Sequence, residues 1–184
     1  MYSDTDILFT KEEKLLKIKD LISDWDYILA LRLIDEILEQ DNDSSTPYHL
    51  KGYIYDIRYW EPKKAEEYYR HALVLDPDNL EAFSHYLSLL NKCKRADLVL
   101  KQLNSRNESD FGHFHEQIIF QKVLALELLG QLNDAQILIN QLINSSINDD
   151  FIEDLEQIIN RISKKIERKT DLSVNNSFYD FKIV

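Results

Sequence analysis

The best candidates for metal ligands in the sequence are the two histidines of the segment His113-Phe114-His115-Glu116. Residues two positions apart do not share a helix face, and no third ligand stands at the spacing that zinc sites use. The segment is therefore expected to be a polar loop that leads into a helix. His49, His71 and His85 stand singly in the sequence, so we expect neither a metal nor another cofactor.

Residues for nucleophilic or acid–base catalysis form no recognisable motif. Cys93 is the single cysteine, which excludes an internal disulfide. The sequence has neither the Gly-x-Ser-x-Gly elbow of hydrolases nor the His-Glu-x-x-His pair of zinc proteases. The acidic residues are numerous but follow the solvent faces of amphipathic segments, which gives no paired carboxylates for acid–base work. The sequence therefore predicts that the protein is not an enzyme.

Composition favours an all-helical domain and argues against a nucleic acid or a membrane as its main partner. The chain has 184 residues, of which 44% are apolar, and glycine and proline occur three times each, too rarely for the turns of an all-β domain. A formal net charge of −11 repels nucleic-acid phosphates and anionic lipids. No apolar run approaches the roughly 20 residues that span a bilayer, and the acidic N-terminus does not fit a secretory signal. We therefore expect a cytoplasmic protein of a single domain.

An alanine opens each of four amphipathic segments. Apolar residues follow every one of these alanines after four and after seven positions, which is the spacing of one helix face. Another segment with helical periodicity precedes each of them. The four residues are Ala30, Ala65, Ala96 and Ala135, and they lie 35, 31 and 39 residues apart. The pattern predicts antiparallel helix pairs in which a small residue lets the two helices cross closely.

This helix–turn–helix period of about 34 residues resembles the tetratricopeptide repeat. The second repeat carries the resemblance most fully. Its matching positions are Tyr48, Gly52, Tyr55, Ala65, Tyr69, Ala72 and Pro77. The string Leu75-Asp76-Pro77-Asp78-Asn79 resembles the family's turn between repeats, in which proline stops one helix and Asp or Asn caps the next. The third repeat departs from the family through a shortened turn, and a longer loop is expected around residues 104–112.

The resemblance implies an all-α fold, an α-solenoid of four antiparallel helix pairs closed by a C-terminal capping helix. The expected repeat domain covers residues 7–169, with repeats at about 10–41, 45–78, 79–105 and 110–146 and the capping helix at 149–169. The basic cluster from Arg161 to Lys169 is interpreted as a solvated helix end. Residues 170–184 are expected to form a tail whose Phe178, Tyr179 and Phe181 either pack on the last helix or fill the protein's own groove.

The resemblance also implies a binding surface, because the family's concave groove is lined by the first helix of each pair. The corresponding positions here are Lys19, His49, Tyr53, Asp56, Glu81, Ser84, His85, Ser88, Gln117, Phe120 and Glu127. One branch of the family clamps a C-terminal carboxylate with paired lysine and asparagine, and the asparagines are missing in this chain. The mixed acidic and aromatic lining suits a partner that presents Lys or Arg together with apolar anchors.

Two functions without catalysis remain open on the sequence. The first is a protein–protein interaction module, an adaptor or chaperone-like protein, that holds a peptide or protein face in the groove. The second is an immunity or antitoxin-type protein that neutralises a basic toxin through charge complementarity. In both cases the partner is a protein or peptide with a basic surface, and neither a nucleic acid nor a membrane. The third possibility is an enzyme, or a subunit that assists one. Turnover by the chain alone would support it.

Overall fold

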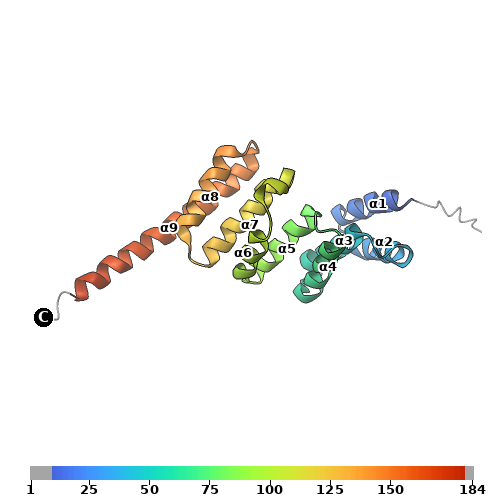
Figure 1. The fold of residues 1–184 in the computed structure, drawn as a ribbon, viewed down its shortest axis with the longest axis horizontal. Helices are drawn as coiled ribbons and strands as arrows, with labels where there is room; N and C mark the ends of the chain where they lie inside the picture. The colour runs from blue at the N-terminus through green and yellow to red at the C-terminus, as the bar shows by residue number, and fades with distance from the viewer. Residues whose placement is uncertain (1–9, 181–184) are drawn as a thin grey trace, which may run out of the picture. The chain divides into compact units, whose positions relative to one another are not determined.

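The computed structural model describes the backbone of residues 10–180 and the side chains of residues 10–169. Within that part of the chain every regular element is helical, which confirms the predicted all-α class (Figure 1). The α-helices are α1 (Lys11–Ser23), α2 (Tyr27–Gln40), α3 (Ser45–Ile54), α4 (Pro62–Leu75), α5 (Leu80–Lys92), α6 (Ala96–Asn104), α7 (His115–Leu128), α8 (Leu132–Ser145) and α9 (Asp149–Asp180). A π-helical turn, η1 (Tyr55–Tyr59), follows α3, and a 3-10 helix, η2 (Glu108–Phe114), precedes α7.

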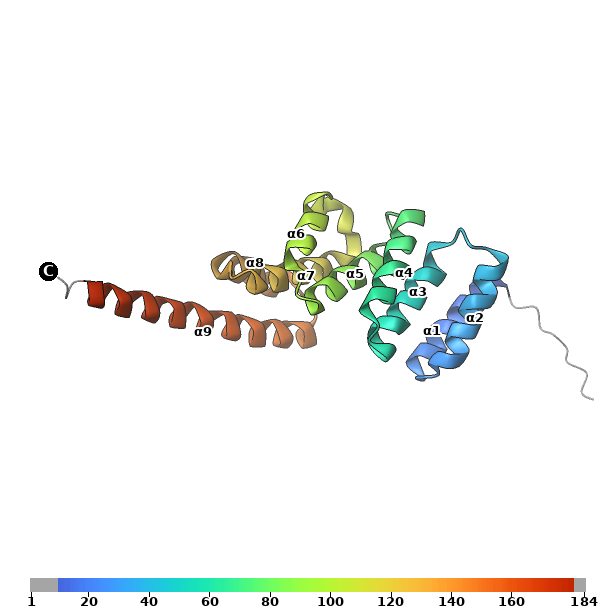
Figure 2. The same cartoon turned by 90° about the horizontal axis from the view of Figure 1, so that it is seen from below.

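The chain divides into two compact units, where the sequence predicts one domain. Unit 1 is Met1–Leu89 and unit 2 is Leu90–Val184, so the division falls within α5. In unit 1, α1 packs on α2, α2 on α3, and α3 on α4. Because only residues 41–44 connect α2 to α3, these helices are antiparallel, and the α1–α2 and α3–α4 turns lie at the same end of unit 1 (Figure 2).

Apolar packing holds the hairpins of unit 1 together. Each fully buried isoleucine or leucine contributes roughly 1.5–3 kcal/mol relative to an exposed one. The buried residues of this core are Ile18, Leu21, Tyr27, Ala30, Ile34, Ile37, Leu50 and Ile54. Their spacing follows the apolar face that the sequence pattern predicts for the first hairpin.

Unit 2 contains the end of α5 and the helices α6 to α9. In this unit α6 packs on α7, α7 on α8, and α8 on α9. Leu155 and Ile162 of α9 are completely buried, so the last helix covers apolar residues of unit 2. The helix begins where the sequence predicts but continues to Asp180 instead of ending at residue 169 (Figure 2). Residues 170–180, expected to belong to a tail, are therefore helical.

The aromatic tail residues fall beyond what the structure describes in full. Phe178 and Tyr179 belong to α9, but their side chains lie outside the described range, and Phe181 lies outside it entirely. Residues 7–9, the expected start of the repeat domain, are likewise outside the described residues.

The same backbone turn joins the two helices of every predicted pair. In each turn one residue has a positive φ angle: Trp25 (64°), Trp60 (49°), Lys94 (59°) and Gly130 (74°). These residues recur at intervals of about 35 positions. The next residue is the N-cap of the following helix, with φ between −82° and −103° in all four cases. The four turns are thus repeats of one local conformation.

Backbone hydrogen bonds explain this conformation. In the α1–α2 turn, the N–H of Trp25 donates to the carbonyl of Ile22 (3.2 Å) and the N–H of Asp26 to that of Leu21 (2.8 Å). The corresponding bonds run from Lys94 to Asn91, from Arg95 to Leu90, from Gly130 to Glu127 and from Gln131 to Leu126. This is the Schellman pattern, which satisfies the last carbonyls of a helix and requires a left-handed residue at its end.

The α3–α4 turn reaches the same geometry through the π-helical turn η1. The N–H of Glu61 donates to the carbonyl of Tyr55 (3.0 Å), six residues earlier, whereas the corresponding bond of the other turns reaches five residues back. Pro62 then stands at the first position of α4, where a backbone N–H is not needed. Nothing in the apolar periodicity of the sequence indicates this extra residue.

The small residue that the sequence predicts for the third helix pair, Ala96, lies one turn before the position that alanine occupies in the other pairs. Ala30, Ala65 and Ala135 are each the fourth residue of their helix, whereas Ala96 is the first residue of α6. The equivalent position in α6 is Val99, which is completely buried. The turn before α6 is therefore not shortened. The departure of this repeat consists of a short second helix and the longer connection that contains η2.

A close approach at Gly52 shows why a small residue is needed in α3. A Cβ atom at this position would lie 2.9 Å from Cδ1 of Tyr69 and 3.3 Å from the carbonyl oxygen of Ala65. Because the Tyr69 ring is completely buried, it has little room to move.

The expected turn after α4 is also present, since the side chain of Asn79 accepts a hydrogen bond from the N–H of Ala82 (2.9 Å) at the start of α5.

Replacing Lys94 by glycine is expected to stabilise the protein by about 0.5–1 kcal/mol. Glycine adopts a positive φ without the steric cost that a Cβ atom has, and this gain exceeds the entropy that glycine adds to the unfolded chain. Lys94 is exposed, so little packing is lost. Urea unfolding measures the change. Lys94→Ala should give no such gain, and Lys101→Gly, in the middle of α6, should cost about 1 kcal/mol. Equal stability of the glycine and alanine variants at position 94 would contradict this account.

Candidate functional site

Unit 1 contains a pocket of about 290 Å³ that is lined by the first helices of three of the four predicted pairs. Its walls come from α1, α3 and α5, and the second helices α2 and α4 contribute nothing to it. The lining residues are Lys19, Ile22, Ser23, His49, Leu50, Tyr53, Glu81 and His85. Of the residues that the sequence assigns to a groove, the pocket brings together Lys19, His49, Tyr53, Glu81 and His85.

A pair of histidine rings forms the floor of the pocket. His49 in α3 is only 1% exposed, and its Nε2 lies 2.8 Å from Nδ1 of His85 in α5. Tyr53, one turn after His49, stacks on the His85 ring with the centroids 4.7 Å apart and the planes at 23°. The α-helical spacing of His49 and Tyr53 therefore places both side chains against the same partner ring.

The second ring nitrogen of His49 is buried without a hydrogen-bond partner. This Nδ1 atom lies 3.9 Å from a carboxylate oxygen of Glu81, and the same oxygen lies 3.8 Å from Nζ of Lys19. Burial, and to a smaller extent the charge of Lys19, lower the pKa of His49 to about 4 from its usual value of 6.5. His49 is therefore neutral at physiological pH. Its Nε2 atom is hydrogen-bonded to His85, and its Nδ1 atom faces Glu81.

The other groove residues expected in unit 1 are less accessible than the sequence suggests. Asp56 was expected to be an exposed acid, but it is 3% exposed. It lies in the π-helical turn η1, so the α-helical register that places it on the exposed face does not hold there. Ser84 is buried and Ser88 is half-buried, and neither lines the pocket.

In unit 2, two of the three expected groove residues of α7 contact α9. Glu127, predicted to be an exposed acid, has a side chain that is 6% exposed, because Arg161 and Lys165 of α9 bind it. Arg161 forms two hydrogen bonds to its carboxylate, at 2.8 and 2.6 Å. Phe120 packs edge-on against Phe151 of α9 (5.7 Å between centroids). Gln117 alone of the three is exposed.

The interpretation of the basic cluster as a solvated helix end is therefore wrong: α9 continues to Asp180, and Arg161 and Lys165 bind Glu127. Burial by itself raises the pKa of Glu127, but the hydrogen bonds from Arg161 and Lys165 outweigh it and hold the pKa below its usual value. Arg161 and Lys165 are four residues apart and so share one helix face. This spacing was visible in the sequence, but the acid that they bind belongs to another helix and could not be identified from it.

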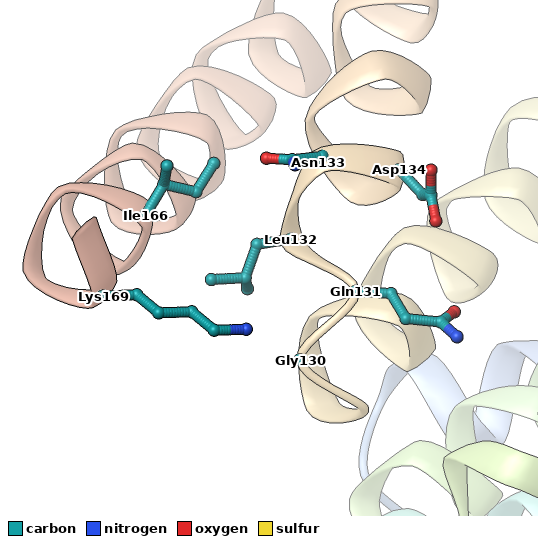
Figure 3. A pocket seen from close by; sticks show the side chains of 7 residues that line it. All are labelled: Gly130, Gln131, Leu132, Asn133, Asp134, Ile166 and Lys169. Atoms are coloured by element: carbon teal, nitrogen blue, oxygen red, sulfur yellow. The ribbon is translucent and has the colours of Figure 1, made fainter. Parts of the chain in front are cut away.

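A second hollow lies in unit 2, beside the turn between α7 and α8. Its volume is about 460 Å³, and Figure 3 shows Leu132, Ile166 and Lys169 pointing toward one another across it. Gln131 and Asp134 point away from this gap (Figure 3). The lining residues are Gly130, Gln131, Leu132, Asn133, Asp134, Ile166 and Lys169, and none of them belongs to the predicted groove.

The predicted loop of His113 and His115 is η2 and the start of α7, and both side chains are exposed. Among the described residues, no group of three or more His, Cys, Asp and Glu side chains is arranged to hold a metal ion. Within the same part of the chain, no helix combines the length and apolar character needed to cross a membrane.

No model of a known protein family matches the sequence, and no curated protein is similar enough to it to indicate a family.

Stability is expected to fall as the pH decreases from about 6.5 to 4, partly because of His49. In this window the unfolded chain binds a proton at His49 and the folded chain does not, so acid favours unfolding by about 1.4 kcal/mol per pH unit. Lys19, Glu81, His85 and Tyr53 face the ring and set its environment. Urea unfolding at several pH values measures the slope. His49→Gln should be less pH-dependent, whereas an unchanged slope would show that His49 titrates normally.

Replacing Glu127 by alanine is expected to destabilise unit 2 by about 1–3 kcal/mol. The change removes the acceptor of three charge-assisted hydrogen bonds, but Arg161 and Lys165 are half-exposed and regain water, which limits the loss. Hydrogen exchange of α9 amides should accelerate. Glu116→Ala, at the other end of α7, serves as the control and should leave α9 unchanged. Slow exchange in α9 of the Glu127 variant would show that apolar packing alone holds the helix.

Proposed function

We propose that this protein is a protein-binding module, and that the pocket in unit 1 receives a side chain from a partner segment lying along α1, α3 and α5. The observation that carries the proposal is that residues from three first helices, far apart in the sequence, form a single pocket. Specific recognition sites for peptides commonly combine such an apolar-walled hollow with a few polar groups that fix orientation. Ile22 and Leu50 supply the apolar wall, while Lys19 and Glu81 supply the polar groups.

The polar groups of the pocket are incompletely paired, which supports a role in binding. Nδ1 of His49 has no hydrogen-bond partner, and the 3.8 Å separation of Lys19 from Glu81 is longer than a hydrogen bond. Lys19 and Glu81 are accessible, so a partner that pairs with them gains contacts that the free protein does not make within itself, whereas Nδ1 of His49 is too deeply buried to be reached. By contrast, the groove residue Glu127 of unit 2 is already bound by α9.

The charge of the partner follows from the whole chain more than from the pocket. With Asp56 and Glu127 buried, Glu81 is the predicted groove acid that remains accessible, and Lys19 stands next to it. The net charge of −11 still attracts a basic protein at long range. A basic partner supports both an adaptor and a toxin-neutralising role, and the identity of the partner decides between them.

Affinity for the partner is expected to fall at least about tenfold when Ser23 is replaced by tyrosine. Ser23 is exposed and lines the pocket, so a large side chain fills it without changing the core. The partner is first captured from the source cells on the full chain, then purified and titrated by calorimetry. Lys17→Tyr, on the same helix but outside the pocket, is the control and should bind normally. Equal affinity of both variants would place the binding surface elsewhere.

Charge reversal separates the pocket from the general charge of the chain. Glu81→Lys should weaken binding more than Glu67→Lys, which has the same charge change on the second helix α4. Equal effects of the two reversals, together with a strong dependence on salt, would indicate that only the net charge attracts the partner.

A further inference from the structure

The two helix turns of unit 1 expose large apolar side chains at one end of the unit. We call this surface the turn face and define it by Trp25, Ile28, Ile57, Tyr59 and Trp60. Trp25 is 77% exposed, Ile28 71% and Trp60 55%. Most of the large apolar side chains that the described part of unit 1 exposes belong to these two turns. None of the five lines the pocket, so the turn face is a separate surface.

Both tryptophans stand where the backbone is left-handed. A bulky residue with positive φ is an outlier that costs on the order of 1 kcal/mol, and glycine is usual at this position of the turn. The equivalent residues of unit 2 are Lys94 and Gly130, with φ of 59° and 74°. Unit 1 thus has a bulky residue in the strained left-handed conformation at both turns, and both aromatic rings are largely exposed to water. A cost of this kind at an exposed aromatic side chain points to recognition.

The charges around the two tryptophans have opposite signs. Asp20, Asp24 and Asp26 are exposed at the α1–α2 turn, beside Trp25. Arg58 and Lys63 are exposed at the α3–α4 turn, beside Trp60. None of these five residues forms an ion pair with another described residue. The turn face therefore presents an acidic aromatic patch next to a basic aromatic patch.

We propose that the turn face binds the turn face of a second copy of this chain in a two-fold symmetric dimer. A two-fold axis between the turns sets the acidic patch of each copy against the basic patch of the other, so the surface is complementary to itself. A partner carrying a single sign of charge would be attracted by one turn and repelled by the other. The alternating charges thus fit a second copy better than a uniformly basic protein.

The exposed apolar area of two turn faces approaches the size at which specific interfaces begin. Fully covered aromatic side chains bury roughly 150–250 Å² each. A symmetric dimer covers four tryptophans, and the isoleucines and tyrosines around them bring the buried surface toward the about 1,200 Å² at which specific interfaces begin. Tryptophan and arginine, both present here, are the residues on which binding energy concentrates in such interfaces.

The experiment measures the mass of the full-length chain in solution by sedimentation equilibrium over a range of concentrations. The dimer should form at micromolar concentrations, where its dissociation constant corresponds to about −8 kcal/mol. Trp25→Asn and Trp60→Asn should weaken it at least about tenfold, since asparagine tolerates a left-handed backbone and keeps the turn. Lys94→Asn, the same change at the equivalent turn of unit 2, is the control and should leave the dimer intact.

Two charge reversals test the complementarity directly. Asp24→Lys alone and Arg58→Glu alone should each be monomeric, because like charges then meet at both contacts of the dimer. An equimolar mixture of the two variants should form a heterodimer, in which each contact again joins opposite charges. Circular dichroism verifies that all variants remain folded, and both substitutions change exposed side chains.

The outcomes are distinct. Dimers of the unaltered chain, monomers of the single variants and recovery on mixing support the proposal. A chain that stays monomeric up to about 100 µM, ten- to a hundredfold above the expected dissociation constant, overturns it. A dimer that tolerates Trp25→Asn and Arg58→Glu also overturns it, because a different surface must then hold the two copies. Monomeric single variants that do not associate on mixing refute the paired charges.

Discussion

A single residue in the left-handed conformation joins the two helices of each of the four pairs in the described part of the chain. That residue ends one helix through Schellman hydrogen bonds, and the next residue caps the following helix, so only two or three residues separate the helices of a pair. The pairing of α1 with α2 and of α7 with α8 follows from this turn, because so short a connection makes the second helix pack antiparallel against the first. The fourth helical residue then meets the preceding helix, where Ala30, Ala65 and Ala135 are completely buried.

The sequence predicts the helices well because their apolar faces recur at helical spacing and the core residues are those the pattern selects. It misses features that depend on the exact number of residues in a turn. Lys94 has no sequence signature of a left-handed residue, so the pattern selects Ala96 where the structure has Val99 at the equivalent position. The π-helical turn η1 similarly adds one residue to the end of α3 and turns Asp56 inward.

For the candidate site, helix assignment alone brings together Lys19, His49, Tyr53, Glu81 and His85, since all are on first helices and face one way. The contact between the His49 and His85 rings was not predictable, because it depends on the distance between α3 and α5. Glu127 shows the opposite case. Its position on a first helix is as expected, but a helix later in the chain supplies two cations that remove it from the surface.

The arrangement of contacts also has a consequence for how the chain folds. Most of the helix packing joins neighbours in the sequence, such as α1 with α2, α3 with α4 and α7 with α8. Chains with such low contact order fold quickly, on microsecond to millisecond timescales, because little loop entropy is lost before the first contacts form. Each hairpin is closed by a turn of two or three residues, so a helix that emerges during synthesis can pack on its partner as soon as the next helix is complete.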